Sequence, residues 1–534
     1  MLSRSAHRFL FLFFSALVAF ALPLSEVGVS IGLIGLVVNW AFEWRYRNFS
    51  RSFSGVVPLF VFLGVYILAI VGLFFTKDFS WAFHDLRIKL PLLLLPIVFF
   101  SSDRLEKKEL NLILFALVIG VFVGSVASML AFWQVIPVEL TSSRSISLFI
   151  SHIRFALLVC MAVSSLVYLI FSQLRELPIF LRIIGIGLVV WLVVFTFILQ
   201  SITGMVIMTL LFGIFLVWRI RAIPNSMYRL WAFSFLGAAV LIGASFVTKT
   251  ISLYYTVEFV DPAIDTYTTA NGRPYTNNFL SKEVENGHFV DLFVCEEELE
   301  REWNRRGSIR YNEVDPEGFH VQYALKRFLT SKGLRKDSVG VWSLSNDEIL
   351  SVSKGVANVL DITPFSIKGK IYRLVREVDR YNRGIGVGGS SLAQRFVYWK
   401  VAGDIFSANW LTGVGTGDIK NAYKQKYIEN PSLFQPQYQL RAHNQYITMF
   451  VTYGFLGGLF FIVALIYPLI VSGAWKEPLV LAFSIILLLS MLNEDTLETH
   501  IGVSFAAFFY SLLVFGWIRG RDIENQQRLN APRQ

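Results

Sequence analysis

Residues 110–134 read LNLILFALVIGVFVGSVASMLAFWQ, a stretch of 25 residues without a charged side chain. A helix of this length and composition is long enough to cross the ~30 Å hydrocarbon layer of a bilayer. The whole chain shares this character, because 54% of its 534 residues are hydrophobic and 16% are charged, against about a quarter charged in soluble domains. The sequence excludes a soluble globular protein and predicts an all-α polytopic membrane protein.

Apolar blocks of similar length recur along the chain, and we expect about twelve transmembrane helices. Their predicted bounds are 9–23, 26–42, 55–75, 86–101, 110–134, 152–172, 183–200, 203–218, 230–248, 444–472, 478–492 and 501–517. The first block, preceded by Arg4 and Arg8, resembles a signal peptide, but no small-residue cleavage site follows it and further spans come at once. We interpret it as a retained first span.

Basic residues are distributed unevenly between the two ends of these predicted spans. With the N-terminus in the cytoplasm, 18 basic residues fall in the inside segments and 4 in the short outside loops. The four outside residues are Lys77, Arg87, Lys89 and Arg144. By the positive-inside rule, this asymmetry predicts that both termini are cytoplasmic.

One long outside segment separates the ninth predicted span from the tenth. Between Lys249 and Arg441 it holds 25 basic and 23 acidic residues, so this segment is nearly neutral. Most of the net charge of +10 therefore belongs to the membrane portion, which gives no support for nucleic-acid binding. We therefore expect four parts: membrane helices one to nine in 1–249, a large periplasmic loop in 250–442, membrane helices ten to twelve in 443–518, and a cytoplasmic tail in 519–534.

The large periplasmic loop is too long to lack structure and is predicted to be mainly helical. Asn346 is a predicted N-cap with Glu348 nearby, and Pro316 is predicted to open another helix. Apolar residues at helical spacing, or clustered charge on a solvated helix, predict helices around 296–300, 319–328, 349–359, 371–378 and 392–405. The glycines of 384–389 favour a flexible linker over a phosphate loop, because no strand precedes them and no Lys-Ser/Thr follows.

Ionisable residues at the predicted outer face are costly there, so each needs a reason. Arg87 and Lys89 are equally well explained by snorkelling toward the outer headgroups and by ligand binding. Arg154 is followed at once by an apolar run, which favours function. Cations at the outer leaflet, in a chain without a nucleotide-binding motif, suit a lipid diphosphate that arginine can hold through two hydrogen bonds.

Two other kinds of chemistry find little support in the sequence. His500 lies near Glu494, Asp495 and Glu498 in one short outer loop, which is more simply a solvated turn than a metal site, so we expect no metal and no cofactor. The chain has two cysteines without an obvious partner, one in an apolar block and one in a polar stretch, and this predicts neither a disulfide framework nor redox chemistry.

A more specific pattern begins at His443, where residues 443–457 read HNQYITMFVTYGFLG. His443 and Asn444 are followed by nine residues, Gly454, two residues and Gly457. Upstream lie the tract GVGTGD at 413–418 and Arg395, three residues before a Tyr-Trp pair. These features together resemble the O-antigen ligase and O-antigen polymerase superfamily, whose ligases carry His, then Asn, Ser or Gln, nine residues, Gly, two residues, and Gly, Thr or Tyr.

The resemblance implies a fold like that of C-type glycosyltransferases in a bacterial inner (cytoplasmic) membrane. It implies transfer of a glycan from undecaprenyl diphosphate to an acceptor hydroxyl at the periplasmic face, with lipid A core or another glycan as acceptor and membrane lipid around the enzyme. His443 would be the general base. The residues expected to bind substrate are Arg154, Arg395, Arg87, Lys89, Asn444, Gly415 and Gly417.

One position departs from the family pattern. Many relatives have an arginine where this chain has Ile202, so the work of that arginine would fall to Arg154 or Arg395. Ligation of O-antigen onto lipid A core is favoured by the nine-residue spacing, and an O-antigen polymerase or a protein O-oligosaccharyltransferase uses the same chemistry. A transporter of lipid-linked sugars is disfavoured, because neither two related halves nor interrupted helices are visible in the sequence.

The charge asymmetry generates a testable topology. We expect a reporter that is active only in the cytoplasm to be silent when fused near Asp347, because residues 250–442 are predicted to lie outside. Fusion of the same reporter after Lys476 gives the positive control. Strong activity at Asp347 contradicts the orientation.

Overall fold

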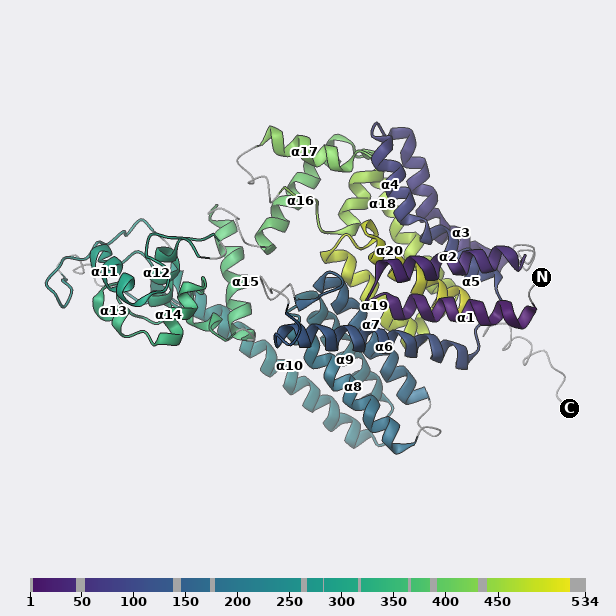
Figure 1. Cartoon of the computed structure of the whole chain (residues 1–534), viewed down its shortest axis with the longest axis horizontal. Helices are drawn as coiled ribbons and strands as arrows, with labels where there is room; N and C mark the ends of the chain where they lie inside the picture. The colour runs from purple at the N-terminus through teal and green to yellow at the C-terminus, as the bar shows by residue number, and fades with distance from the viewer. Residues whose placement is uncertain are drawn as a thin grey trace. The chain divides into compact units, whose positions relative to one another are not determined.

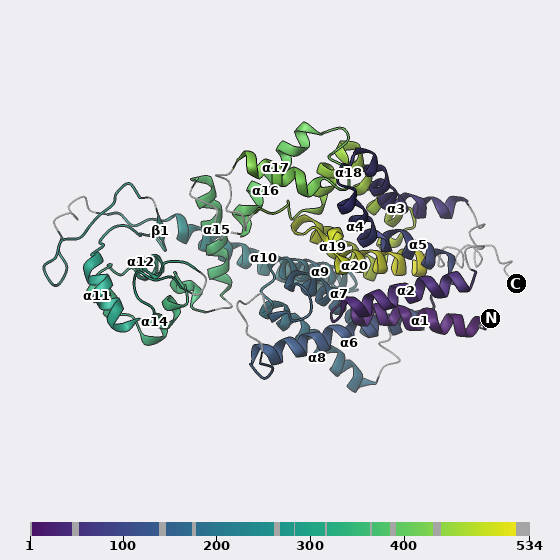
Figure 2. The same cartoon turned by 45° about the horizontal axis from the view of Figure 1, so that its top comes forward.

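The computed structural model describes residues 3–44, 53–137, 146–172, 178–260, 267–281, 283–315, 318–363, 366–384, 391–430 and 439–518. It is 74% helical with almost no sheet, as predicted from the sequence (Figures 1 and 2). The chain divides into two compact units, of which the first comprises Met1–Trp218 with Gln394–Gln534 and the second Arg219–Ala393.

The first unit is a bundle of apolar helices built from both ends of the chain. Its N-terminal elements are α1 (Arg4–Ala21), α2 (Glu26–Phe42), α3 (Phe53–Val71), the short 3₁₀ helix η2 (Gly72–Phe75), α4 (Phe79–Lys89), α5 (Pro91–Ser101), α6 (Lys107–Phe132), α7 (His152–Ser172), α8 (Ile179–Ile198) and α9 (Ile202–Arg221). Its C-terminal elements are α16 (Ser391–Ala408), α17 (Ile419–Glu429), α18 (Gln445–Val471), η7 (Ala474–Lys476), α19 (Pro478–Asn493), η8 (Thr496–Glu498), α20 (His500–Tyr510) and η9 (Ser511–Ile518), the last a π-helix.

In the described part of the chain, nine helices are long and apolar enough to cross a membrane, and the apolar helices α2 and α19 are shorter. The predicted span 86–101 is divided between α4 and α5, because Pro91 opens a new helix at its first position. The sequence therefore located the apolar helices correctly, while the count of twelve spans stays a prediction.

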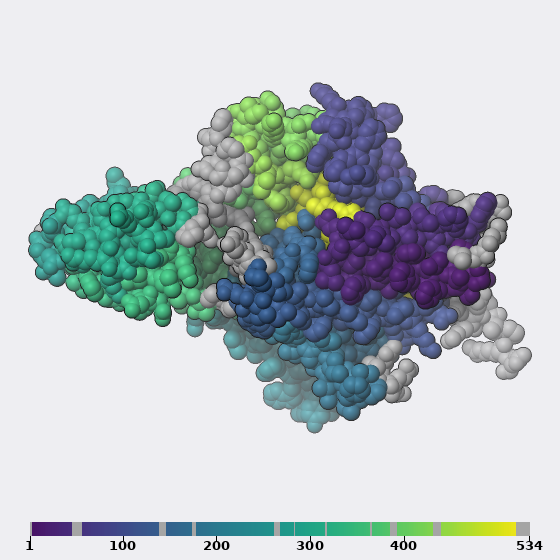
Figure 3. All heavy atoms as spheres, in the orientation of Figure 1, coloured from purple at the N-terminus to yellow at the C-terminus, as the bar shows by residue number. Residues whose placement is uncertain are grey.

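The centre of the first unit is α20 with η9. Every residue from Ile501 to Ile518 is buried, and Phe62 of α3 stacks on Tyr510 with ring centroids 4.1 Å apart. α5, α2 and α4 all pack against α20. In the space-filling view of Figure 3, the yellow C-terminal segment shows only through a narrow opening between purple, blue and green atoms.

The two ends of this helical bundle carry different polar contacts. At the end where α1 begins, Arg8 donates from Nε to Glu109 at 2.8 Å and from Nη2 to the carbonyl of Arg104 at 2.8 Å, joining α1 to the start of α6. At the end where α2 begins, Ser30 lies 3.2 Å from His500 Nε2, at the start of α20. Since α1 and α2 are consecutive and antiparallel, the polar loops before α18 and α20 lie at the end opposite the N-terminus.

A break interrupts α18 at Gly454, whose φ of +70° is not helical. The amide of Phe455 donates to the carbonyl of Trp410 at 2.7 Å, and the carbonyl of Thr452 accepts from the amide of Gly415 at 2.9 Å. The loop between α16 and α17 thus satisfies the backbone groups that the break releases. No interrupted helix was visible in the sequence, so the break at Gly454 corrects that interpretation. Glycine permits such a break, and the contacts with the facing loop stabilise it.

The second unit is a small mixed domain on a long apolar helix. Its elements are α10 (Ser226–Tyr255), β1 (Val284–Glu285), β2 (His288–Phe289), α11 (Glu296–Arg306), α12 (Val321–Ser331), α13 (Ser338–Trp342), α14 (Asn346–Ser353), η5 (Val359–Asp361) and α15 (Ile367–Asn382). β1 and β2 pair antiparallel, with Val284 opposite Phe289. Asn286 and Gly287 between them both have positive φ, as the two-residue turn of a tight hairpin requires.

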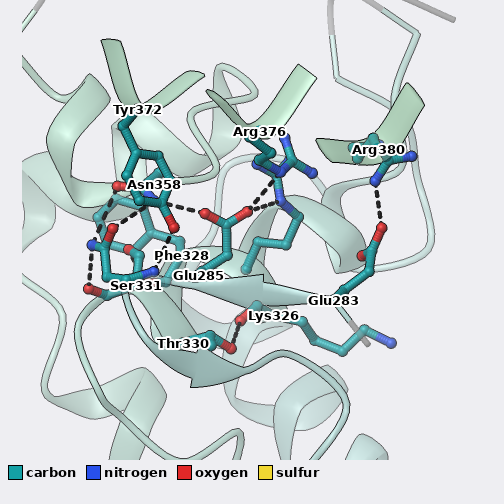
Figure 4. A network of polar contacts seen from close by, with 12 residues as sticks. Glu283, Glu285, Lys326, Phe328, Thr330, Ser331, Asn358, Tyr372, Arg376 and Arg380 are labelled. Atoms are coloured by element: carbon teal, nitrogen blue, oxygen red, sulfur yellow. Dashed lines mark hydrogen bonds and ion pairs between the residues drawn. The ribbon is translucent and has the colours of Figure 1, made fainter. Parts of the chain in front are cut away.

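A polar network ties this hairpin to α15. The buried carboxylate of Glu285 accepts from Arg327 at 2.7 Å, from Asn358 at 2.7 Å and from Arg376 at 3.2 Å. Figure 4 shows Arg376 and its neighbour Arg380 on α15, each aimed at a glutamate on or beside β1. A buried carboxylate with three donors is stable, whereas loss of one donor leaves charge uncompensated.

Local predictions in this region are mostly confirmed, with two corrections. Helices occur at each of the five predicted stretches, but the N-cap of α14 is Ser345, one residue before Asn346, and Glu348 completes its capping box. In α11, Glu298 is not on a solvated face: it is fully buried and accepts hydrogen bonds from Thr269, Asn271 and Ser338. Pro316 and most of the glycine tract, 385–389, lie outside the described residues.

The break in α18 gives a stability prediction. A Cβ on Gly454 would lie 2.2 Å from the carbonyl oxygen of Leu411, and φ is already in the left-handed region. We expect Gly454→Ala to destabilise the protein by about 3 kcal/mol or more, from strain and clash together. Gly473 is the matched control, with φ of +65° and nothing within 4 Å of its Cβ position, and Gly473→Ala should cost about 1–2 kcal/mol. Thermal unfolding in detergent measures both, and equal losses contradict the packing account.

Candidate functional site

His443 lies in the segment between α17 and α18, two residues before α18 begins. Its φ is +46°, a left-handed conformation that is uncommon for any residue other than glycine. The side chain is half-buried, and its ring centroid lies 5.9 Å from that of the buried Tyr398. Strained backbone of this kind is concentrated at functional sites, so the conformation marks His443 independently of its sequence motif.

One face of α16 supports the histidine segment. Arg395, Tyr398 and Trp399 are three and four residues apart, so their side chains share a face of the helix. Trp399 Nε1 donates to the carbonyl of Ala442 at 3.0 Å, and Arg395 Nη2 lies 3.4 Å from the carbonyl of Asn493. This explains physically why an arginine three residues before a Tyr-Trp pair belongs with the histidine motif.

Asn444 is the N-cap of α18. Its Oδ1 accepts from the amide of Ile447 at 3.1 Å, and its Nδ2 donates to the carbonyl of Leu492 at 3.0 Å. Both functions of the amide are therefore used inside the protein. The structure thus shows Asn444 starting α18, while its expected part in substrate binding stays a prediction.

The electrostatic surroundings of His443 keep its imidazole neutral. Burial lowers the pKa of His443 below its ordinary value of 6.5; the carboxylate of Asp495 opposes that shift, and Arg395, Arg441 and Arg154 lower the pKa further. Asp495 is itself buried and accepts from Thr448 Oγ1 at 2.6 Å. A neutral imidazole can accept a proton, which an imidazolium cannot.

Arg154 opens onto a small pocket between α7 and the start of α20. Glu494, Thr496 and Gly502 line this pocket with it. Burial raises the pKa of Glu494, and Arg154 and Arg395 oppose that effect by stabilising its charge. The charges of Arg154 and Arg395 therefore act on both Glu494 and His443.

The position of Ile202 lies beside this group. Its neighbour Thr203 accepts a hydrogen bond from Asn493 Nδ2 at 3.1 Å, and the carbonyl of Asn493 is the group that faces Arg395. Ile202 itself is exposed.

Lys89 is placed differently from the expectation. Its Nζ lies 2.8 Å from Asp85 and 2.9 Å from Glu498, and all three side chains are buried. Arg441 Nη1 approaches the second oxygen of Glu498 at 3.2 Å. The amine of Lys89 therefore already forms ion pairs with two carboxylates inside the protein. Arg87 on the same helix is exposed.

Two residues of this cluster were not singled out from the sequence. Glu498 was interpreted as part of a solvated turn, but burial, which would raise its pKa, is outweighed by Lys89 and Arg441, and the pKa of Glu498 falls to about 2. Arg441 was counted only as the end of the large loop. The sequence feature that could have identified Arg441 is its position two residues before His443, at a predicted membrane surface.

The glycines of the 413–418 tract approach the chain's own backbone. A Cβ on Gly415 would lie 2.7 Å from the carbonyl oxygen of Phe75, and one on Gly417 would lie 2.0 Å from that of Asp78. Asp418 accepts from the amides of Lys77 and Asp78 at 2.6 and 3.1 Å. Packing against the link between α3 and α4 explains why glycine is needed here, and an approach of Gly415 and Gly417 to a ligand stays a prediction.

Asp495, Glu498 and His500 each have a partner within the protein. Glu498 binds two cations, Asp495 binds Thr448, and His500 faces Ser30. Across the residues that the structure describes, no group of three or more His, Cys, Asp or Glu side chains is placed to hold a metal ion.

Part of the sequence that forms this site matches a known protein family. Residues 342–462 match the family described as O-Antigen ligase. This match supports assignment to the O-antigen ligase superfamily. No curated protein matches the chain. The matched domain supports lipid-linked glycan transfer of the ligase or polymerase type, and together with the apolar helices it supports a multi-pass protein of the bacterial inner membrane.

The matched region covers only part of the site. It includes Arg395, the 413–418 tract and His443, and it ends inside α18. Arg154 on α7, Lys89 on α4 and the carboxylates of 494–498 come from outside it. The family domain thus supplies the histidine together with Arg395 and Arg441, and the remaining membrane helices supply the other charges around them.

Proposed function

We propose that this protein transfers a glycan from undecaprenyl diphosphate to an acceptor hydroxyl at the periplasmic face, and that its reaction is ligation of O-antigen to lipid A core. The observation that carries the proposal is a neutral, half-buried His443 in a strained conformation, with Arg154 and Arg395 close enough to lower its pKa. The family match and the position of this group at the end of the bundle opposite the N-terminus support it.

His443 is proposed as the general base. Its neutral imidazole accepts the proton of the acceptor hydroxyl as that oxygen attacks the anomeric carbon of the glycan. The bond between the anomeric carbon and the diphosphate oxygen breaks, and undecaprenyl diphosphate leaves with the bonding electrons. Since diphosphate is a good leaving group, the reaction as proposed requires neither a nucleotide nor a metal.

The arginines are proposed to bind the diphosphate. Each guanidinium offers a planar pair of donors that matches phosphate oxygens, and its charge offsets the negative charge that grows on the leaving group. Glu494 lies near both arginines and keeps them from repelling one another when the donor is absent. Binding and charge stabilisation are therefore assigned to Arg154 and Arg395, and proton transfer to His443.

The lipid products of a deletion strain test ligation against its alternatives. Loss of a ligase leaves polymer on the carrier lipid, whereas loss of a polymerase leaves single repeat units on the core. Loss of a protein O-oligosaccharyltransferase leaves proteins without glycan. Any pattern other than accumulated polymer contradicts the ligase assignment.

Substitution at the site separates chemistry from binding. We expect His443→Ala to lower turnover roughly 10²- to 10⁴-fold with donor binding nearly intact, because only proton transfer is lost. Arg154→Ala and Arg395→Ala should weaken donor binding as well as turnover, and lysine should restore them only in part. Turnover with purified protein, lipid-linked donor and acceptor measures both effects. Parental turnover in folded His443→Ala protein contradicts the catalytic assignment.

The pH profile provides an independent test. A base acts when neutral, so activity should be constant above its pKa and fall as pH drops through it. Because burial and three arginines lower the pKa of His443, we expect the midpoint of kcat/KM to lie below 6.5. Arg395→Gln removes one of these cations, so the midpoint should move upward whatever the loss in amplitude. A midpoint that stays unchanged contradicts the proposed electrostatic coupling.

A further inference from the structure

Four charged side chains form a continuous chain at the same end of the bundle as His443. Asp85 and Lys89 of α4 are joined at 2.8 Å, Lys89 and Glu498 at 2.9 Å, and Glu498 and Arg441 at 3.2 Å. The charges alternate in sign and sum to zero. The chain links α4, the η8 loop and the segment before α18, which are distant in sequence.

The first three members are buried and the fourth is not. The side chains of Asp85, Lys89 and Glu498 are between 5% and 7% exposed, while that of Arg441 is 24% exposed. Buried ion pairs are costly to desolvate and often contribute little net stability. The buried part of this network ends at Arg441, whose side chain is partly exposed. Holding Arg441 in position explains the network better than a gain in folding stability does.

Arg441 retains unused hydrogen-bonding capacity. Among the residues that the structure describes, its protein partner is Glu498, reached through Nη1. Arg441 lies two residues before His443 in the segment that leads into α18, and its charge, like those of Arg154 and Arg395, lowers the pKa of His443. Nε and Nη2 of a guanidinium held at Nη1 form one edge of the planar fork, the edge that binds two phosphate oxygens at once.

Glu498 is fixed from several sides. Besides Lys89 and Arg441, it accepts from Gln445 Nε2 at 3.2 Å, and Gln445 Oε1 in turn accepts from the amide of Leu497 at 2.7 Å. Its carboxylate therefore has little freedom to follow Arg441. The constraint runs from Glu498 to the arginine, as expected of a residue that sets another's position.

We propose that Arg441 is a further residue that binds the diphosphate of the donor, and that Glu498 is the positioning residue that orients it. This inference rests on the proposed function, since it adds a third arginine to the same leaving group. The ligand class is a diphosphate, free or lipid-linked.

Inhibition of the full-length protein by inorganic pyrophosphate is the test. One charge-assisted hydrogen bond to a ligand is worth about 1.5–3 kcal/mol, or roughly 10- to 150-fold in affinity. We expect Arg441→Gln to raise the inhibition constant of pyrophosphate and the KM for the lipid-linked donor by at least 10-fold, with a smaller effect on kcat. Lys424→Gln, which removes an exposed cation from α17 of the same unit, is the matched control and should change neither.

A double-mutant cycle isolates the role of Glu498. Glu498→Gln should weaken pyrophosphate inhibition several-fold, and the double variant should be no weaker than Arg441→Gln alone, because Glu498 acts through the arginine. Additive losses overturn the positioning role. If Arg441→Gln fails to fold, Arg441→Lys keeps the charge and loses the fork, and an inhibition constant equal to the parental one overturns the binding role.

These outcomes are distinct from failure of the proposed function. If the parental protein transfers no glycan from a lipid diphosphate, the proposed function fails. If it does so while Arg441→Gln keeps the parental KM and inhibition constant, only the present inference fails.

Discussion

The contact of Glu498 with both Lys89 and Arg441 is the interaction on which the candidate site depends. A carboxylate buried at a membrane surface requires cations, and the cations require it. Because its partners lie on α4 and just before α18, Glu498 fixes the distance between two helices from opposite ends of the chain. The nearby carboxylates and arginines are arranged around that fixed point.

A second constraint acts on the backbone. In a bilayer, amide and carbonyl groups that a helix releases must find partners within the protein. The break at Gly454 is possible because the loop after α16 provides those partners, and this loop contains the glycines of the 413–418 tract. Glycines spaced along two separate motifs are thus explained by one packing arrangement, in which the backbone of the tract lies between α18 and the end of α3.

The sequence predicted the features that are local in the chain. Apolar runs gave the membrane class and the approximate helix bounds, and the apolar spacing in 392–405 predicted the helix that carries Arg395 and Tyr398. The hairpin at Asn286-Gly287 carries a short-range signal that the helical interpretation of the loop passed over. The pairing of Arg441 with Glu498 joins residues 57 positions apart, and hydropathy and charge pattern do not encode such a pairing. The same limit applies to the buried Glu285 and Glu298, which the sequence shows only as surface-type residues.

The conformation of His443 follows from what holds its neighbours. Ala442 is fixed by Trp399 through its carbonyl, and Asn444 is fixed by the helix that it caps and by the carbonyl of Leu492. A left-handed residue costs on the order of 1–3 kcal/mol, which a few hydrogen bonds of about 1 kcal/mol each can offset. None of these bonds uses the imidazole, so the strain is borne by the scaffold and the ring nitrogens are left for chemistry. The asparagine that follows the histidine thereby gains a physical reason: it caps α18 directly after His443 and holds the backbone there.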